Sequence, residues 1–141
     1  MADKIAADMA AHGGLISKED LAAYRPVERA PLIGTYRGLT IYTMPPASAG
    51  GVTLIEMLNI LETKDVKAAG LGSAAELHLI AEALKLGTAD RYAHLGDTGF
   101  VKVPLKGLTS KAYAAELAKQ ISSERSIPSS ALKAGDPIPY E

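Results

Sequence analysis

The chain has 141 residues, of which 48% are hydrophobic and 22% charged, and its formal net charge at pH 7 is -1. This composition is typical of a folded globular protein and excludes a disordered one. No segment combines basic and aromatic residues as a nucleic-acid-binding surface would, so we expect no nucleic-acid partner. The chain has no cysteine, which excludes thiol catalysis, disulfides and thiolate metal sites.

Membrane and targeting patterns are also missing from the sequence. No apolar run approaches the roughly 18 residues that a bilayer-spanning helix needs. The first residues lack the charged start and apolar stretch of a signal peptide. We therefore expect no membrane partner for this chain.

Two helices are predicted at the N-terminal end. Residues 2–12 are rich in strong helix formers, and Gly13 follows where a left-handed helix end is expected. A helix that begins at the first residue is what a cut through a longer protein would give. Ser17 then precedes acidic residues and predicts the N-cap of a short helix ending near Tyr24, because Pro26 disfavours helix at the residue before it.

A β-hairpin and a stiff loop follow. Residues 30–44 carry β-branched and aromatic side chains on both sides of a turn at 36–38, which predicts an antiparallel hairpin. The segment 45–51, Pro-Pro-Ala-Ser-Ala-Gly-Gly, ends it. Its prolines fix the backbone and its glycines permit close approach of other atoms, so we interpret it as a rigid lip.

Two longer helices are expected next. Thr53 and Glu56 have the spacing of a capping box and predict a buried helix over roughly 52–63. Ser73 and Glu76 repeat the pattern and predict a second helix from near 74 to Tyr92. Apolar residues recur at helical spacing in both, namely Leu54, Met57, Leu58 and Leu61 in the first and Leu77, Ile80, Ala81 and Leu84 in the second. Gly87 inside the second helix suggests that another backbone passes close by.

The last part of the chain contains one more predicted helix. Thr109 or Ser110 would cap it, with Tyr113, Leu117 and Ile121 facing inward. The tail from 126 to 141 is rich in Pro, Ser and Gly and is expected to be extended or loose. The residues together predict an α+β fold, mainly helical, with a short antiparallel hairpin.

Few residues suggest chemistry on their own. The histidines His12, His78 and His94 lack the spacing of a helical metal pair, so surface or helix-end roles and no metal site are expected. The charged residues Asp90, Arg91 and Asp97 more often make helix-end caps and ion pairs than a site. Ser48 is the one candidate for substrate binding, because a Gly-rich turn can present N–H groups beside a hydroxyl. No catalytic residue and no cofactor motif is found.

Several motifs in order resemble the gamma-glutamyltransferase family. They are Gly-Gly-Leu-Ile from residue 13, Glu-Asp-Leu from 19, Tyr-Arg-Gly from 36, Pro-Pro-x-Ser-x-Gly-Gly from 45, Ala-Asp-Arg from 89 and Leu-Gly-Asp from 95. The likeness covers essentially the whole chain. Ala47 and Ala49 stand where the family often has Pro and Ser, and Thr98 where Pro is usual.

The resemblance implies that residues 1–141 are the C-terminal segment of a large subunit, a single incomplete domain of an Ntn-hydrolase αββα sandwich. In this family the precursor cuts itself before a Thr, which would lie just past Glu141. That Thr attacks the γ-glutamyl amide, and its α-amino group acts as the base. The Thr and the Arg that holds the substrate α-carboxylate are both missing here. The chain alone is therefore expected to be inactive.

The resemblance also implies the partners, which are the rest of the large subunit, the Thr-bearing small subunit and a small γ-glutamyl substrate. The parent is expected to be secreted or periplasmic. Isolated, the chain is expected to expose apolar faces and self-associate. Two alternatives stay open: a segment of a related acylase such as a cephalosporin acylase, and a non-catalytic binding or structural module.

Overall fold

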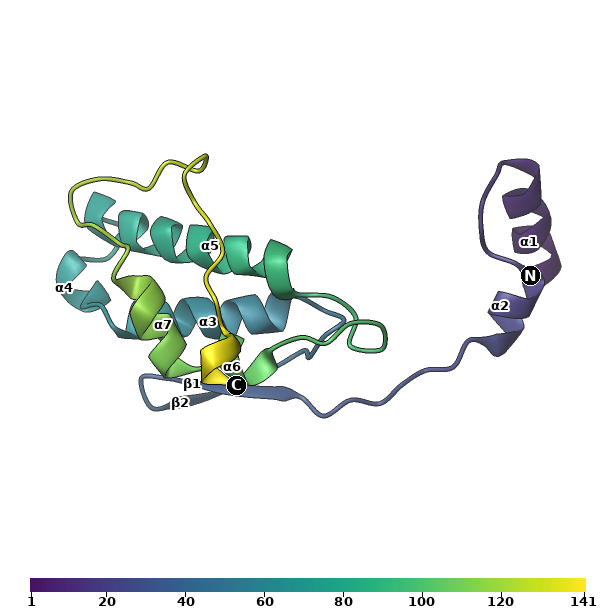
Figure 1. Ribbon diagram of the computed structural model, residues 1–141, viewed down its shortest axis with the longest axis horizontal. Helices are drawn as coiled ribbons and strands as arrows, with labels where there is room; N and C mark the ends of the chain where they lie inside the picture. The colour runs from purple at the N-terminus through teal and green to yellow at the C-terminus, as the bar shows by residue number, and fades with distance from the viewer.

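The computed structural model describes residues 1–141 and begins with two short helices that lie apart from the rest (Figure 1). Helices α1 (Ala2–Ala11) and α2 (Lys18–Ala23) contact one another and contain no buried residue. The predicted N-cap at Ser17 is confirmed, since its side chain accepts a hydrogen bond from the Asp20 N–H at 3.1 Å. An extended segment then leads to the body, so these helices form an arm (Figure 1).

The predicted hairpin is confirmed as an antiparallel pair of strands, β1 (Leu32–Tyr36) and β2 (Leu39–Thr43). Its turn places Arg37 at φ 48° and Gly38 at φ 83°. Two successive positive φ angles suit the right-handed twist of a two-residue hairpin turn. Gly34 lies on the face that packs on the helices.

Helix α3 (Gly50–Glu62) is the central element of the body, because β1, α5 (Ala74–His94) and α7 (Lys111–Ala118) all pack against it. The connections contain the short helices α4 (Val66–Ala69) and α6 (Leu105–Leu108), and the 3-10 turn η1 (Ile138–Tyr140) ends the chain. None of the helices has both the length and the apolar character needed to cross a membrane. The hydrophobic core lies between them and consists of Val52, Ile60, Leu61, Ala83, Leu86, Val103, Leu108, Tyr113, Ala114, Leu117, Ala118 and Ile121.

The structure corrects which faces of α3 and α5 are buried. Of the predicted apolar stripes, Leu54, Leu77 and Leu84 are 43–58% exposed, whereas Leu61 is buried. The helices instead meet through small and carboxyl-bearing residues. Gly87 packs closely there, because a Cβ on it would lie 3.2 Å from Met57 Cγ. Its neighbour is therefore a side chain of α3 and not a backbone as predicted.

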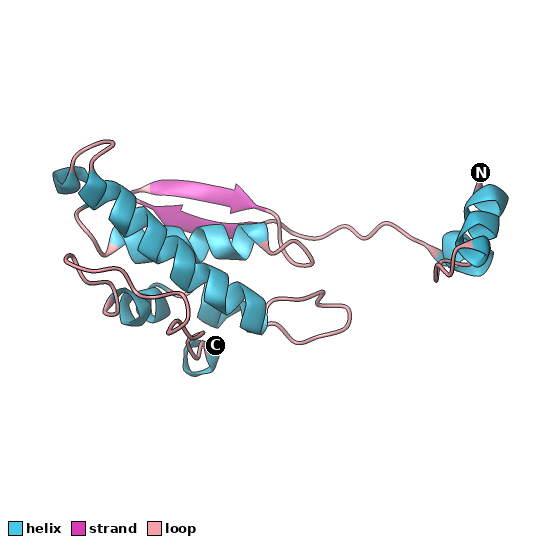
Figure 2. Ribbon diagram, turned by 90° about the horizontal axis from the view of Figure 1, so that it is seen from above, coloured by secondary structure: helices cyan, strands magenta, loops and turns pink.

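The C-terminal tail is extended but is not loose. After α7 it loops over α5 and runs back down to α6, where the chain ends (Figures 1 and 2). Pro137 is fully buried, and the Tyr140 ring lies 5.3 Å from that of Tyr113, centre to centre. We call residues 126–141 the strap.

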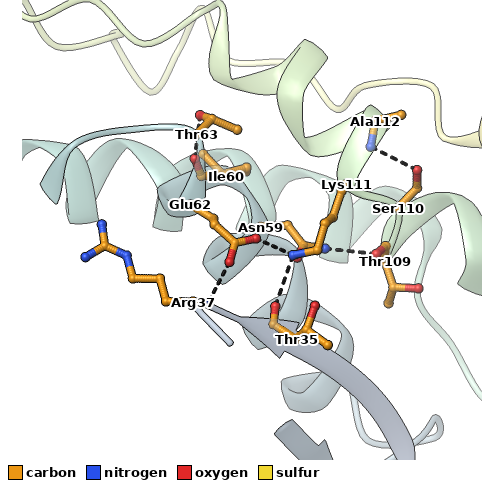
Figure 3. A network of polar contacts seen from close by, with 10 residues as sticks. All are labelled: Thr35, Arg37, Asn59, Ile60, Glu62, Thr63, Thr109, Ser110, Lys111 and Ala112. Atoms are coloured by element: carbon orange, nitrogen blue, oxygen red, sulfur yellow. Dashed lines mark hydrogen bonds and ion pairs between the residues drawn. The ribbon is translucent and has the colours of Figure 1, made fainter. Parts of the chain in front are cut away.

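A polar clamp holds the hairpin to the helices (Figure 3). Lys111, at the start of α7, donates to the Thr35 carbonyl at 3.2 Å and to Asn59 Oδ1 at 3.2 Å, and it pairs with Glu62. The other oxygen of Glu62 accepts the Arg37 N–H at 2.5 Å. These bonds lower the pKa of Glu62, with the Lys111 bond the largest cause. The clamp therefore joins β1, the hairpin turn, α3 and α7.

Replacing Lys111 by Met should destabilise the body by about 1 kcal/mol, since it removes a half-exposed charged donor from three acceptors. The matched control is Lys119→Met. Lys119 pairs only with the exposed Glu116, and its loss should change little. Urea unfolding measures both; equal effects would show that the clamp contributes nothing specific.

Candidate functional site

The loop that contains Ser48 is shorter than predicted. Helix α3 begins at Gly50, so the loop covers 45–49. The predicted capping box of Thr53 and Glu56 is wrong. The Thr53 hydroxyl donates to the Ala49 carbonyl at 3.0 Å inside the first helical turn, and Glu56 is buried against α5.

Ser48 is exposed and lines a shallow pocket at the start of α3. Arg29 brings a guanidinium to the same pocket; it lies 3.8 Å from Asp97 and donates to Thr98 at 3.4 Å. The pocket offers hydrogen-bond donors but no general base, since none of its lining residues is His, Asp or Glu. These residues are Val27, Arg29, Met44, Pro45, Pro46, Ala47 and Ser48.

The two glycines after the loop differ in what they permit. A Cβ on Gly51 would lie 2.1 Å from the Met44 carbonyl oxygen and 2.8 Å from Thr43 Oγ1. A Cβ on Gly50 would meet only Ser48 Oγ, at 3.9 Å. The predicted close approach is therefore confirmed at Gly51 alone, where the end of β2 crosses the first turn of α3.

Gly51→Ala should lower the free energy of unfolding by about 1–3 kcal/mol or more, because the backbone of β2 must move to admit the methyl group. Gly50→Ala is the control at the neighbouring position. It should be neutral or stabilising by up to about 1 kcal/mol through helix propensity. Thermal unfolding of both variants measures the difference, and equal stabilities would contradict the close contact.

Two carboxyl groups meet in the interior between α3 and α5. Glu56 and Asp90 are each 1% exposed, and the two carboxyl groups interact there. Asp90 also accepts the Tyr113 hydroxyl and the Gly135 N–H, the latter at 2.7 Å. The predicted helix-end ion pair of Asp90 is wrong. Asp90 is instead a buried acceptor that joins α3, α5, α7 and the strap.

Burial holds Glu56 in its protonated form. Desolvation raises its pKa to about 10, and the hydrogen bond to Asp90 and the charge of Asp90 act in the same direction. Glu56 Oε1 receives no hydrogen bond from a protein donor, so nothing would stabilise a second negative charge there. Burial, followed by the hydrogen bond to Asp90, also raises the pKa of Tyr113. Glu56 and Tyr113 are therefore both protonated at neutral pH.

A second buried carboxylate lies earlier on α5. Glu82 is 1% exposed and accepts hydrogen bonds from the Ser126 hydroxyl at 2.6 Å and the Ile127 N–H at 3.1 Å. Lys85 pairs with it at 2.7 Å. Burial acts to raise the pKa of Glu82, but these three bonds outweigh it, so its pKa lies below the ordinary value. The sequence reasoning singled out neither Glu82 nor Glu56 as a buried polar group.

The histidines have structural roles, as expected. His78 Nε2 donates to the Ser122 carbonyl at 2.6 Å, and His94 Nε2 donates to the Gly135 carbonyl at 2.9 Å. His12 contacts Asp8 at the end of α1. No three His, Asp or Glu side chains converge in a geometry that could hold a metal ion.

The raised pKa of Glu56 predicts a pH dependence of stability. Its carboxyl ionises near pH 4.5 when unfolded but near pH 10 when folded. The contribution of Glu56 to the free energy of unfolding is therefore complete below pH 4.5. It declines as pH rises toward 10, by up to about 1.4 kcal/mol per pH unit. Urea unfolding between pH 5 and 9 should show this decline, and Glu56→Gln should flatten it.

Glu116→Gln is the control for this titration, because Glu116 is exposed on α7. Its profile should follow that of the unchanged protein. If the stability of Glu56→Gln varied with pH as that of the unchanged protein does, Glu56 would not bind a proton on folding.

Known proteins are similar to this chain along its whole length. The model of the family described as Gamma-glutamyltranspeptidase matches residues 1–140. The glutathione hydrolase proenzyme of Escherichia coli K12 is 51% identical over 141 residues, all of this chain but 24% of the relative. The Acylase ACY 1 proenzyme of Pseudomonas sp. strain V22 is 50% identical over 117 residues, 83% of this chain and 21% of the relative.

A solved structure agrees with these sequence matches. The crystal structure of Helicobacter pylori gamma-glutamyltranspeptidase superposes with a TM-score of 0.88 at 43% identity, over 95% of this chain and 38% of that one. The chain thus spans about a quarter of the length of the curated relatives it matches.

Proposed function

Because this chain belongs to the gamma-glutamyltranspeptidase family, we propose that it is the C-terminal segment of the large subunit of an enzyme that transfers or hydrolyses γ-glutamyl groups. The observation that carries this proposal is the 51% identity to the E. coli glutathione hydrolase proenzyme over every residue of the chain. The name of that relative suggests glutathione as a substrate.

In this proposal the chain supports a reaction centre housed mainly in other segments. An N-terminal Thr of the small subunit attacks the γ-glutamyl amide, its α-amino group accepts the hydroxyl proton, and water or an amino acid resolves the acyl-enzyme. No residue described above has the geometry of a nucleophile with its base. Ser48 stays our candidate for a residue beside the substrate cleft, supported by its exposure and by Arg29 in the same pocket.

Exposed apolar side chains support the expected partners. On the outer face of the hairpin Ile33, Tyr42 and Met44 are 56–68% exposed, and Leu77 and Leu84 are similarly open on α5. We propose that further strands cover the hairpin and complete an αββα sandwich, with the rest of the large subunit and the small subunit supplying them. Self-association of the isolated chain follows from the same surfaces.

A second candidate activity is that of an amide acylase, favoured by the 50% identity to Acylase ACY 1 proenzyme. The two enzymes would differ in the residues that bind the acyl group. A γ-glutamyl group carries an α-amino and an α-carboxyl group, whereas a plain dicarboxylic acyl group lacks the amine. A pair of anilides that differ in this amine therefore separates the candidates.

We expect the full-length precursor to release aniline from a γ-glutamyl anilide at least tenfold faster than from the des-amino anilide, because one missing polar contact costs about 1.4 kcal/mol or more. This chain alone should release none. Preference for the des-amino anilide would favour the acylase. Turnover by the isolated chain, or none by the precursor with either anilide, would contradict the proposed function.

A further inference from the structure

The strap is held at two points by buried carboxylates of one helix. Glu82 accepts the Ile127 N–H and the Ser126 hydroxyl, and Asp90 accepts the Gly135 N–H. The two anchors are about 12 Å apart along the helix axis, and their directions around the axis differ by roughly a quarter turn. The strap between them runs along α5 in the same direction as the helix.

The last residues of the strap are held as closely as its start. The Gly107 N–H donates to Glu141 Oε1 at 2.9 Å, and a Cβ on Gly107 would lie 2.1 Å from the Pro137 carbonyl oxygen. His94 donates to the Gly135 carbonyl at 2.9 Å. Contacts with α5 and α6 therefore fix the path of the backbone from Gly135 to Glu141.

Packing alone does not explain why these anchors are carboxyl groups. Burying a carboxylate costs several kcal/mol, and an apolar side chain of similar size would serve the core as well or better. A carboxylate can, however, accept N–H and O–H groups with a fixed direction. Four of the donors to Glu82 and Asp90 are Ser126, Ile127, Gly135 and Tyr113, and three of these belong to the strap.

We propose that Glu82 and Asp90 are positioning residues for self-cleavage of the precursor, an inference that rests on the proposed function. In the family that the sequence resembles the cut precedes a Thr, which would follow the strap. The anchors that fix the strap would then also fix the approach of that bond to the attacking Thr. They act through the backbone and do not touch the reacting atoms.

The reaction itself needs only water. The Thr hydroxyl oxygen forms an ester bond to the preceding carbonyl carbon, the C–N bond breaks, and the hydroxyl proton passes to the freed amine. Water then hydrolyses the ester, which leaves a C-terminal carboxylate on the large subunit and a free Thr hydroxyl and amine on the small one. A misplacement of about 1 Å between the attacking oxygen and the carbonyl can slow such a step by about 100-fold.

The test compares two forms of the enzyme carrying Asp90→Asn or Glu82→Gln. In the full-length precursor we expect cleavage, followed by gel electrophoresis, to slow by about tenfold to 100-fold. In the second form the two subunits are co-expressed as separate chains, so no cleavage is needed. There kcat and KM for the γ-glutamyl anilide should be unchanged, because the strap no longer has to present a bond.

Ser126→Ala is the milder variant. Ser126 is exposed, and its side chain only donates to Glu82 and accepts from the Lys85 amine. The precursor should therefore fold, with cleavage slowed by a few-fold. Glu116→Gln, on the exposed face of α7, is the control and should cleave at the unchanged rate. If Asp90→Asn or Glu82→Gln gives no soluble precursor, Ser126→Ala decides.

Each outcome bears on one claim. Normal cleavage rates in the variants, or equal losses of cleavage and of two-chain activity, would overturn the positioning role and leave the proposed function intact. An unmodified precursor that neither cleaves itself nor turns over the anilide would overturn the proposed function itself.

Discussion

The buried pair of carboxyl groups, Glu56 and Asp90, lies where α3, α5, α7 and the strap meet. Both side chains are almost fully buried, so two charges there would repel strongly in a poorly hydrated interior. Burial raises the pKa of Glu56 to about 10, and its protonation removes one of these charges. Asp90 accepts the Tyr113 hydroxyl and the Gly135 N–H. The contact between the helices and the course of the C-terminal segment depend on this arrangement.

The placement of polar groups between the helices explains the apolar surface outside. Because α3 and α5 meet through Glu56, Gly87 and Asp90, several of their leucines point away from this interface. The outer face of the hairpin is apolar as well. A chain that spans a quarter of its relatives' length would carry such faces if the remaining segments cover them. This is the arrangement that our proposed function requires.

Local signals in the sequence predicted the elements well. Ser17, Ser73 and Ser110 cap α2, α5 and α7 as expected, because a short side chain bonds to N–H groups two or three residues away. Contacts between distant segments were not predictable. Periodicity selected the leucine stripes of α3 and α5 as buried, although carboxyl groups occupy the interface. The anchors of the strap depend on residues more than 40 positions apart, and no local pattern reports them.

The most direct test of this account is amide hydrogen exchange of Ile127 and Gly135, resolved residue by residue in the full-length protein. If buried Glu82 and Asp90 hold the strap, both N–H groups should exchange as slowly as the interior of α5, because exchange then requires the helices to open. The Lys133 N–H, between the two anchors, should exchange faster. Exchange of Ile127 and Gly135 at the rate of an open peptide would contradict the account.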